Sequence, residues 1–116
     1  MSTRLPGARY KSVFARGNSA KGRYLVAWHL NSDGAGHKAG VVVSKKSFHR
    51  AVERNRAKRL MREAFRLLVK DGRMPEGVEW VFVGRSSLGG KKVQDVVEDI
   101  AAVSARVSGR PQPSVR

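Results

Sequence analysis

The feature that most constrains the fold of this chain is a long amphipathic segment at residues 48–70. Apolar side chains recur there at helical spacing, which predicts one helix with a single apolar stripe. That stripe consists of Ala57, Leu60, Met61, Ala64 and Leu68, with Phe65 at its edge. Gly72 and Pro75 follow the segment and predict its end, because neither residue favours a helix interior.

The opposite side of this predicted helix is almost purely cationic. Residues 45–70 carry +8 of the formal charge of +15. A solvated face is the alternative, but such a concentration favours a binding surface for a polyanion. Guanidinium groups can bind phosphates bidentately, and an amide can hold a sugar hydroxyl or a phosphate. The candidate contact residues are Lys45, Lys46, Arg50, Arg54, Asn55, Arg56, Lys58, Arg59, Arg62 and Arg66.

The rest of the chain predicts a small α+β fold. Period-two alternation and β-forming residues predict strands at 24–30, 39–44 and 78–83. Helical spacing predicts a short helix at 8–16 and a longer one at 93–107. We expect the first two strands to pair as a hairpin across the turn-rich residues between them. This order of elements predicts a two-layer sandwich of a small sheet and about three helices.

Length and composition narrow the class of protein. A chain of 116 residues allows one domain, which we place at residues 1–107, and we expect 108–116 to be a disordered tail. The chain has no cysteine, which excludes disulfides and thiolate zinc sites and fits a cytoplasmic location. No apolar run approaches the ~20 residues that span a bilayer. A basic amphipathic helix can lie on an anionic membrane, but we favour nucleic acid as the partner.

The cationic face favours RNA over DNA. A helix that reads the DNA major groove usually mixes polar side chains among its cations. Here the side chains are nearly all suited to phosphates, which fits recognition of the backbone and shape of a structured RNA. We therefore expect no DNA partner and no membrane partner.

Three aromatic residues, Tyr10, Phe14 and Trp28, are candidates for stacking on unpaired bases. Pattern alone favours the other interpretation, because an aromatic side chain on a helix stripe or an alternating strand is usually a core residue.

Candidates for catalysis are weak. The histidines at 29, 37 and 49 lack the spacing of metal ligands. Asp95, Glu98 and Asp99 share one helix face and could recruit magnesium, but a solvated acidic face is the favoured interpretation. We therefore predict no catalytic residue and no protein-bound metal site.

A more specific signal lies in the order of residues around the long helix. Residues 40–46 (GVVVSKK) are followed by Ala51-Val52 and then by residues 54–66 (RNRAKRLMREAFR). This run closely resembles the signature of the bacterial ribonuclease P protein subunit. Near the N-terminus, Tyr10, Val13, Phe14 and Gly17 are similar to the first-helix motif of that family, although a Phe is usual at position 10. Further along, residues 78–83 with Arg85 resemble its last strand and the basic residue after it.

The resemblance covers about residues 9–105 and carries its own expectations. It implies a mixed sheet of four strands, with a short strand near residues 18–21 that the residue pattern does not predict. It also implies a left-handed βαβ crossover, in a fold shared with a domain of a ribosomal protein. Proteins of this family bind a large catalytic RNA, which performs hydrolysis with magnesium that the RNA mainly holds.

The resemblance also assigns roles to the candidate residues. The Arg-Asn-Arg helix would meet the catalytic RNA, with Arg85 as a further contact. A cleft between the first helix and the sheet, lined by Tyr10, Phe14 and Trp28, would take the single-stranded 5′ leader of precursor tRNA. The alternatives are a structural RNA-binding protein such as a ribosomal component, and a stand-alone nuclease. The nuclease is disfavoured because the sequence offers no cluster of acids or histidines to hold metal or move protons.

Overall fold

The structure is a computed structural model that describes residues 3–32, 34 and 36–108. It contains three α-helices, four strands and one turn of 3₁₀ helix within these residues. In chain order they are α1 (Gly7–Arg16), β1 (Asn18–Lys21), β2 (Leu25–Asn31), β3 (His37–Val42), α2 (Ala51–Lys70), β4 (Val78–Gly84), η1 (Ser86–Leu88) and α3 (Val93–Ser108). The predicted α+β class, with a small mixed sheet and three helices, is confirmed. Residues 109–116 of the predicted tail lie outside the described residues.

The four strands form one sheet in the order β1-β2-β4-β3. Strand β4 pairs antiparallel with β2, where Ala27 lies opposite Phe82, and parallel with β3, where Val41 lies opposite Phe82. The predicted hairpin between residues 24–30 and 39–44 is therefore wrong. The reason is that β4 is buried along nearly its whole length on both faces, which places it in the interior of the sheet.

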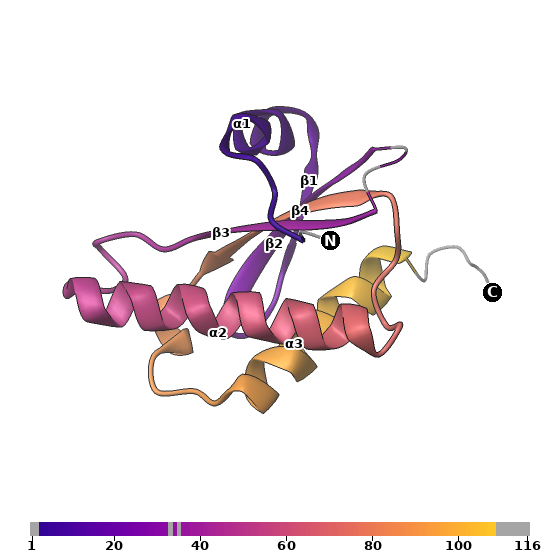
Figure 1. The fold of residues 1–116 in the computed structure, drawn as a ribbon. Coiled ribbons are helices and arrows are strands. Elements are labelled where there is room, and N and C mark those ends of the chain that lie inside the picture. Colours follow the sequence, from indigo (N-terminus) through magenta and orange to yellow (C-terminus); the bar gives the residue numbers. More distant parts are fainter. Residues whose placement is uncertain (1–2, 33, 35, 109–116) are drawn as a thin grey trace.

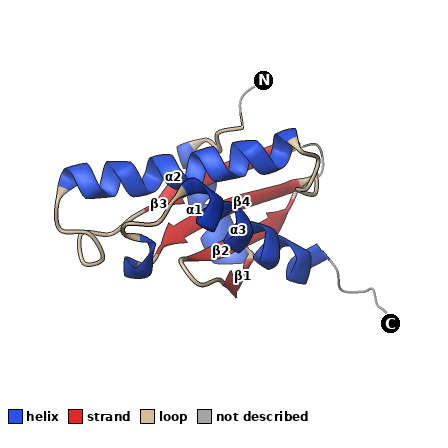
Figure 2. Cartoon of the chain, turned by 90° about the horizontal axis from the view of Figure 1, so that it is seen from below, coloured by secondary structure: helices blue, strands red, loops and turns tan. Residues whose placement is uncertain are grey.

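One face of the sheet packs against α2 and α3, whereas α1 lies across the other face (Figure 1). Figure 2 shows the same sheet from below, with α2 running along it. The main core lies between the sheet and α2 with α3, where the rings of Trp80 and Phe82 stack at 5.7 Å. Phe65, expected at the edge of the α2 stripe, is only 2% exposed because its ring packs 5.8 Å from that of Phe82.

Strand β1 confirms the short fourth strand that the family resemblance implied at residues 18–21. Its residues are mostly exposed, and it forms one edge of the sheet beside β2. The other edge belongs to β3, where the N-terminal arm (residues 3–5) lies alongside. Ala39 donates its N–H to the carbonyl of Thr3 at 2.8 Å and accepts the N–H of Leu5 at 3.0 Å. The arm thereby covers part of an edge that would otherwise leave backbone groups unpaired.

Candidate nucleic-acid interface

The segment that leads into α2 is held by local hydrogen bonds. Arg54 donates from Nη1 to the carbonyls of Phe48 and His49, each at 2.9 Å. The ring of Phe48 is buried and anchors this segment to the core. At the start of the helix, the carboxylate of Glu53 accepts the N–H of Arg50 at 3.4 Å. Arg54 therefore fixes the entry to α2, while Lys45, Lys46 and Arg50 are exposed in the segment before it.

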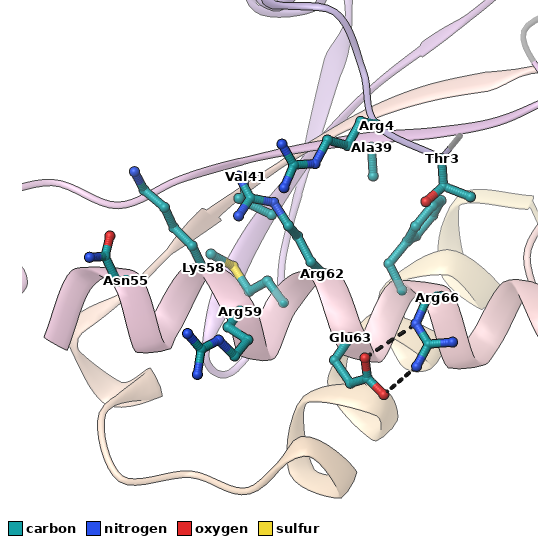
Figure 3. A pocket seen from close by; sticks show the side chains of 12 residues that line it. Thr3, Arg4, Ala39, Val41, Asn55, Lys58, Arg59, Arg62, Glu63 and Arg66 are labelled. Carbon is teal, nitrogen blue, oxygen red and sulfur yellow. Dashed lines mark hydrogen bonds and ion pairs between the residues drawn. The ribbon is translucent and has the colours of Figure 1, made fainter. Parts of the chain in front are cut away.

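A groove separates α2 from β3 and the N-terminal arm. Its cavity measures about 540 Å³. Figure 3 shows Lys58 and Arg62 rising from α2 toward Arg4 on the arm, so that cations border the groove on both sides. Alanine, valine, methionine and phenylalanine side chains form its apolar part. We call this site the cationic groove; it is lined by Thr3, Arg4, Ala39, Val41, Asn55, Lys58, Arg59, Met61, Arg62, Glu63, Phe65 and Arg66.

Five of the predicted RNA-binding residues thus meet in one place, namely Asn55, Lys58, Arg59, Arg62 and Arg66. Arg66 is not a free cation there, because its Nη2 forms an ion pair with Glu63 at 2.6 Å.

Arg56 and Arg85 do not lie in the cationic groove. Arg56 lines a second hollow on the side of α2 that faces α3. Arg85 is exposed after β4 and donates from Nη1 to the carbonyl of Gly22 at 2.9 Å, beside the turn between β1 and β2.

Arg4 and Thr3 are groove residues that sequence reasoning did not identify. Their pairing with β3 depends on contacts between segments far apart in the chain, which the residue pattern does not reveal. The signal in the sequence is Arg4, a cation within this short segment. It could have identified the arm as part of the cationic surface.

The three predicted aromatic residues lie on the α1 side of the sheet but do not share one environment. Phe14 and Trp28 form an edge-to-face pair with ring centroids 5.4 Å apart. Phe14 remains 37% exposed, so part of its ring is open to solvent. Phe14 therefore offers part of its ring to a ligand that stacks on aromatic side chains, with the half-buried Trp28 beside it.

Tyr10 contributes to the fold as well as to this surface. Its hydroxyl accepts the N–H of Val41 at 3.2 Å, on the edge strand β3. Its ring lies directly over Gly40, where an added Cβ atom would approach the ring to 2.3 Å. Glycine at position 40 therefore permits α1 to lie close to β3, and Tyr10 holds it there.

An ion pair fixes α1 to the central strand. Arg9 donates from Nε and Nη2 to the carboxylate of Glu79, with the shortest contact at 2.8 Å. Glu79 is only 6% exposed, on β4. Hydrogen bonding to Glu79, together with its negative charge, raises the pKa of Arg9 above its ordinary value. Arg9 therefore orients the helix that carries Phe14, and its guanidinium group is occupied by Glu79.

Two of the three acidic residues of α3 also have structural partners. Both carboxylate oxygens of Asp99 accept backbone N–H groups, from Arg23 and Tyr24, at 2.8 Å each. Asp95 accepts the N–H of Lys92 at 3.0 Å, at the start of α3. In the part of the chain that the structure describes, no three His, Cys, Asp or Glu residues gather as metal ligands would. Nor does any helix within the described ranges have both the length and the apolar character needed to cross a membrane.

Comparison with known proteins identifies the family. The family model for Ribonuclease P matches residues 5–108. A ribonuclease P protein component from Pelotomaculum thermopropionicum is 38% identical over 97 residues, which is 84% of each chain. One from Pseudomonas fluorescens is 34% identical over 109 residues, covering 92% of this chain and 80% of that one.

The solved structures agree with the sequence relatives. The fold matches the RNase P protein of Thermotoga maritima with a TM-score of 0.76 at 28% identity, covering 91% of this chain and 98% of that one. It matches the RNase P protein of Staphylococcus aureus with a TM-score of 0.74 at 23% identity, over 93% and 97% of the two chains, a likeness that concerns the fold. The α+β fold, the match over nearly the whole chain and the relatives above 30% identity together show that this chain belongs to the ribonuclease P protein family.

Proposed function

We propose that this chain is the protein subunit of a bacterial, cytoplasmic ribonuclease P and that it binds both the RNA subunit and precursor tRNA. The observation that carries this proposal is the cationic groove, where Arg4, Lys58, Arg59 and Arg62 surround one cavity. Such a groove suits a phosphodiester backbone, which guanidinium groups grip without reading the sequence. In a member of this family, the polyanion that fits best is the ribonuclease P RNA.

The α1 side of the sheet is the proposed site for the single-stranded 5′ leader. The exposed Phe14 ring and its partner Trp28 offer a surface for stacking. Leaders differ in sequence between tRNAs, and stacking suits such a ligand because every base has a face to stack. The nearby ion pair between Arg9 and Glu79 keeps α1 at a fixed position over the sheet.

The RNA subunit is proposed to perform the hydrolysis with magnesium that it mainly holds. Several carboxylates of this chain already have partners of their own: Glu79 pairs with Arg9, Glu63 with Arg66, and Asp99 with the turn before β2. A hard cation such as Mg²⁺ needs several oxygen ligands, which an RNA offers through its phosphates. The contribution of the protein is then to neutralise phosphate charge and to position the leader, so that less magnesium is needed.

Reconstitution with a bacterial ribonuclease P RNA tests this proposal directly. We expect the protein to increase cleavage of precursor tRNA at low magnesium relative to the RNA alone. A structural RNA-binding protein would give no preference for precursor over mature tRNA in the same complex. Equal cleavage with and without the protein would contradict the proposal, and cleavage by the protein alone would instead support a stand-alone nuclease.

Phe14→Ala is expected to weaken binding of leader-bearing tRNA selectively. Loss of one stacking ring costs about 1–3 kcal/mol per base, which corresponds to roughly 5- to 150-fold in affinity. We expect the reconstituted complex to bind mature tRNA as before, and paired affinity measurements on the two tRNAs check this. Ala15→Gly, at the next and also exposed position of α1, controls for a change in the helix itself. If the variant loses equal affinity for both tRNAs, Phe14 is not a leader contact.

A further inference from the structure

A valine is exposed at the start of the cationic face of α2. Val52 is 67% exposed and, with Phe14, is one of the large apolar side chains that stand out at the described surface. Asn55 and Arg56 follow Val52 by three and four residues on the same face, and Arg59 lies one more turn along the helix. An isolated apolar side chain at a surface needs no explanation, but this one belongs to a hollow.

The hollow lies between α2 and the start of α3 and measures about 560 Å³. Three apolar side chains contribute to it: Val52 and the half-buried Leu60 and Val93. The polar members of its lining are Asn55, Arg56, Arg59 and Glu63. A smaller cavity of about 150 Å³ adjoins it and shares Arg56 and Leu60. We call the larger space the Val52 hollow.

The Val52 hollow adjoins the cationic groove. Asn55, Arg59 and Glu63 line both spaces, so the two open on adjacent sides of the same helix face. In Figure 3, Arg59 extends from α2 to the opposite side from Lys58 and Arg62. A strand whose phosphates lie in the groove would therefore bring its neighbouring groups to the hollow.

The chemistry of the hollow differs from that of the groove and suits a base rather than a phosphate. Apolar side chains pack on the face of a base, and arginine guanidinium planes stack on it. The amide of Asn55 can donate to and accept from a base edge, and the carboxylate of Glu63 can accept from an exocyclic amine. Glu63, which pairs with Arg66 at 2.6 Å, also lines the cationic groove. What sets the hollow apart is that Val52, Leu60 and Val93 line it, whereas Lys58 and Arg62 line only the groove.

We propose that the Val52 hollow binds one unstacked nucleobase of the RNA whose backbone lies in the cationic groove. This site rests on the proposed function, because the base belongs to the ribonuclease P RNA. It adds a contact with a base to a surface that otherwise recognises phosphates. Structured RNA is commonly recognised through unpaired bases that leave the stack, so the combination of a phosphate groove and a base pocket is physically coherent.

Site-directed crosslinking tests the proposal, because the chain has no cysteine of its own. A Val52→Cys variant carrying an azidophenacyl group is irradiated in complex with full-length ribonuclease P RNA. We expect crosslinks that centre on one unpaired nucleotide. Ala105→Cys, at an exposed position of α3, is the matched control and should give no crosslink at that nucleotide. Removing the base of the crosslinked nucleotide should then weaken binding about 5- to 150-fold without changing the salt dependence.

A second variant gives a readout that a structural role would not reproduce. Val52→Thr keeps the side-chain shape and replaces a methyl group by a hydroxyl group. We expect several-fold weaker RNA binding with an unchanged slope of log K against log salt, whereas loss of a phosphate contact changes that slope.

The outcomes separate this inference from the proposed function. If the wild-type protein binds no ribonuclease P RNA, both fail. If it binds but position 52 crosslinks only to protein or to paired nucleotides, or if base removal leaves the affinity unchanged, the base pocket is wrong and the proposed function stands.

Discussion

Arg62→Ala is expected to weaken binding of the ribonuclease P RNA and to reduce its dependence on salt. Arg62 lies on the exposed side of α2 and lines the cationic groove opposite Arg4. Each phosphate contact contributes a slope of about 0.7–0.9 in log K against log salt. Loss of one contact should therefore lower the slope by that amount and weaken binding about five- to eightfold at 0.1 M salt. Titrations of the RNA at several salt concentrations measure both quantities.

The double variant Arg59→Ala with Arg62→Ala should show the sum of two such contacts, which is about 25- to 60-fold weaker binding at 0.1 M salt. Lys70→Ala is the matched control, because Lys70 is an exposed cation at the far end of the same helix. It removes the same formal charge as either single variant. If Lys70→Ala changes the slope as much as Arg62→Ala does, binding reports net charge alone and the cationic groove has no special role.

The structure also separates cations that looked equivalent in the sequence. Arg54 donates to two carbonyls before α2, and Arg66 pairs with Glu63, whereas Arg62 is exposed toward the groove. Replacing Arg54 should therefore affect the folding of the segment before α2 more than the salt slope. These differences depend on neighbours in space, so helical spacing could predict the cationic face but not how each of its charges is used.

Most elements of the fold could be predicted because their signals are local. The stripe of α2 and the alternation of β2 and β4 each arise from side chains within one segment, and the structure places these elements within a few residues of the predicted ranges. The pairing of strands is not local. Residues 24–30 and 39–44 are close in the chain, yet β4 lies between them, because its burial on both faces outweighs the short connection that favoured a hairpin.

Strand β1 is a second element whose formation depends on contacts that are not local in the sequence. Its sequence, Asn-Ser-Ala-Lys, contains residues with little preference for strands, so pattern alone did not predict it. Pairing with β2 and the turn at residues 22–24 hold it in place. In the candidate site, the arm residues Thr3 and Arg4 were missed for the same reason, since their position depends on hydrogen bonds to Ala39.

Asp99→Ala is expected to have the largest effect on stability of any single polar substitution that we consider. Asp99 is only 5% exposed and accepts the N–H groups of Arg23 and Tyr24, each at 2.8 Å. Gly22 lies against the same carboxylate, so close that an added Cβ atom would come within 2.7 Å of it. The carboxylate therefore organises the turn between β1 and β2 from α3. Its removal leaves two backbone donors without partners, which should lower the free energy of unfolding by about 2–4 kcal/mol.

Urea unfolding measures this loss as a lower midpoint with an unchanged m-value. Asp99→Asn keeps one acceptor oxygen and should recover about half of the loss, because only one of the two N–H groups regains a partner. Glu98→Ala is the control: its side chain is the next one along α3, is exposed, and should change stability by less than about 0.5 kcal/mol. If Asp99→Ala and Glu98→Ala shift the midpoint equally, the carboxylate of Asp99 does not hold the turn.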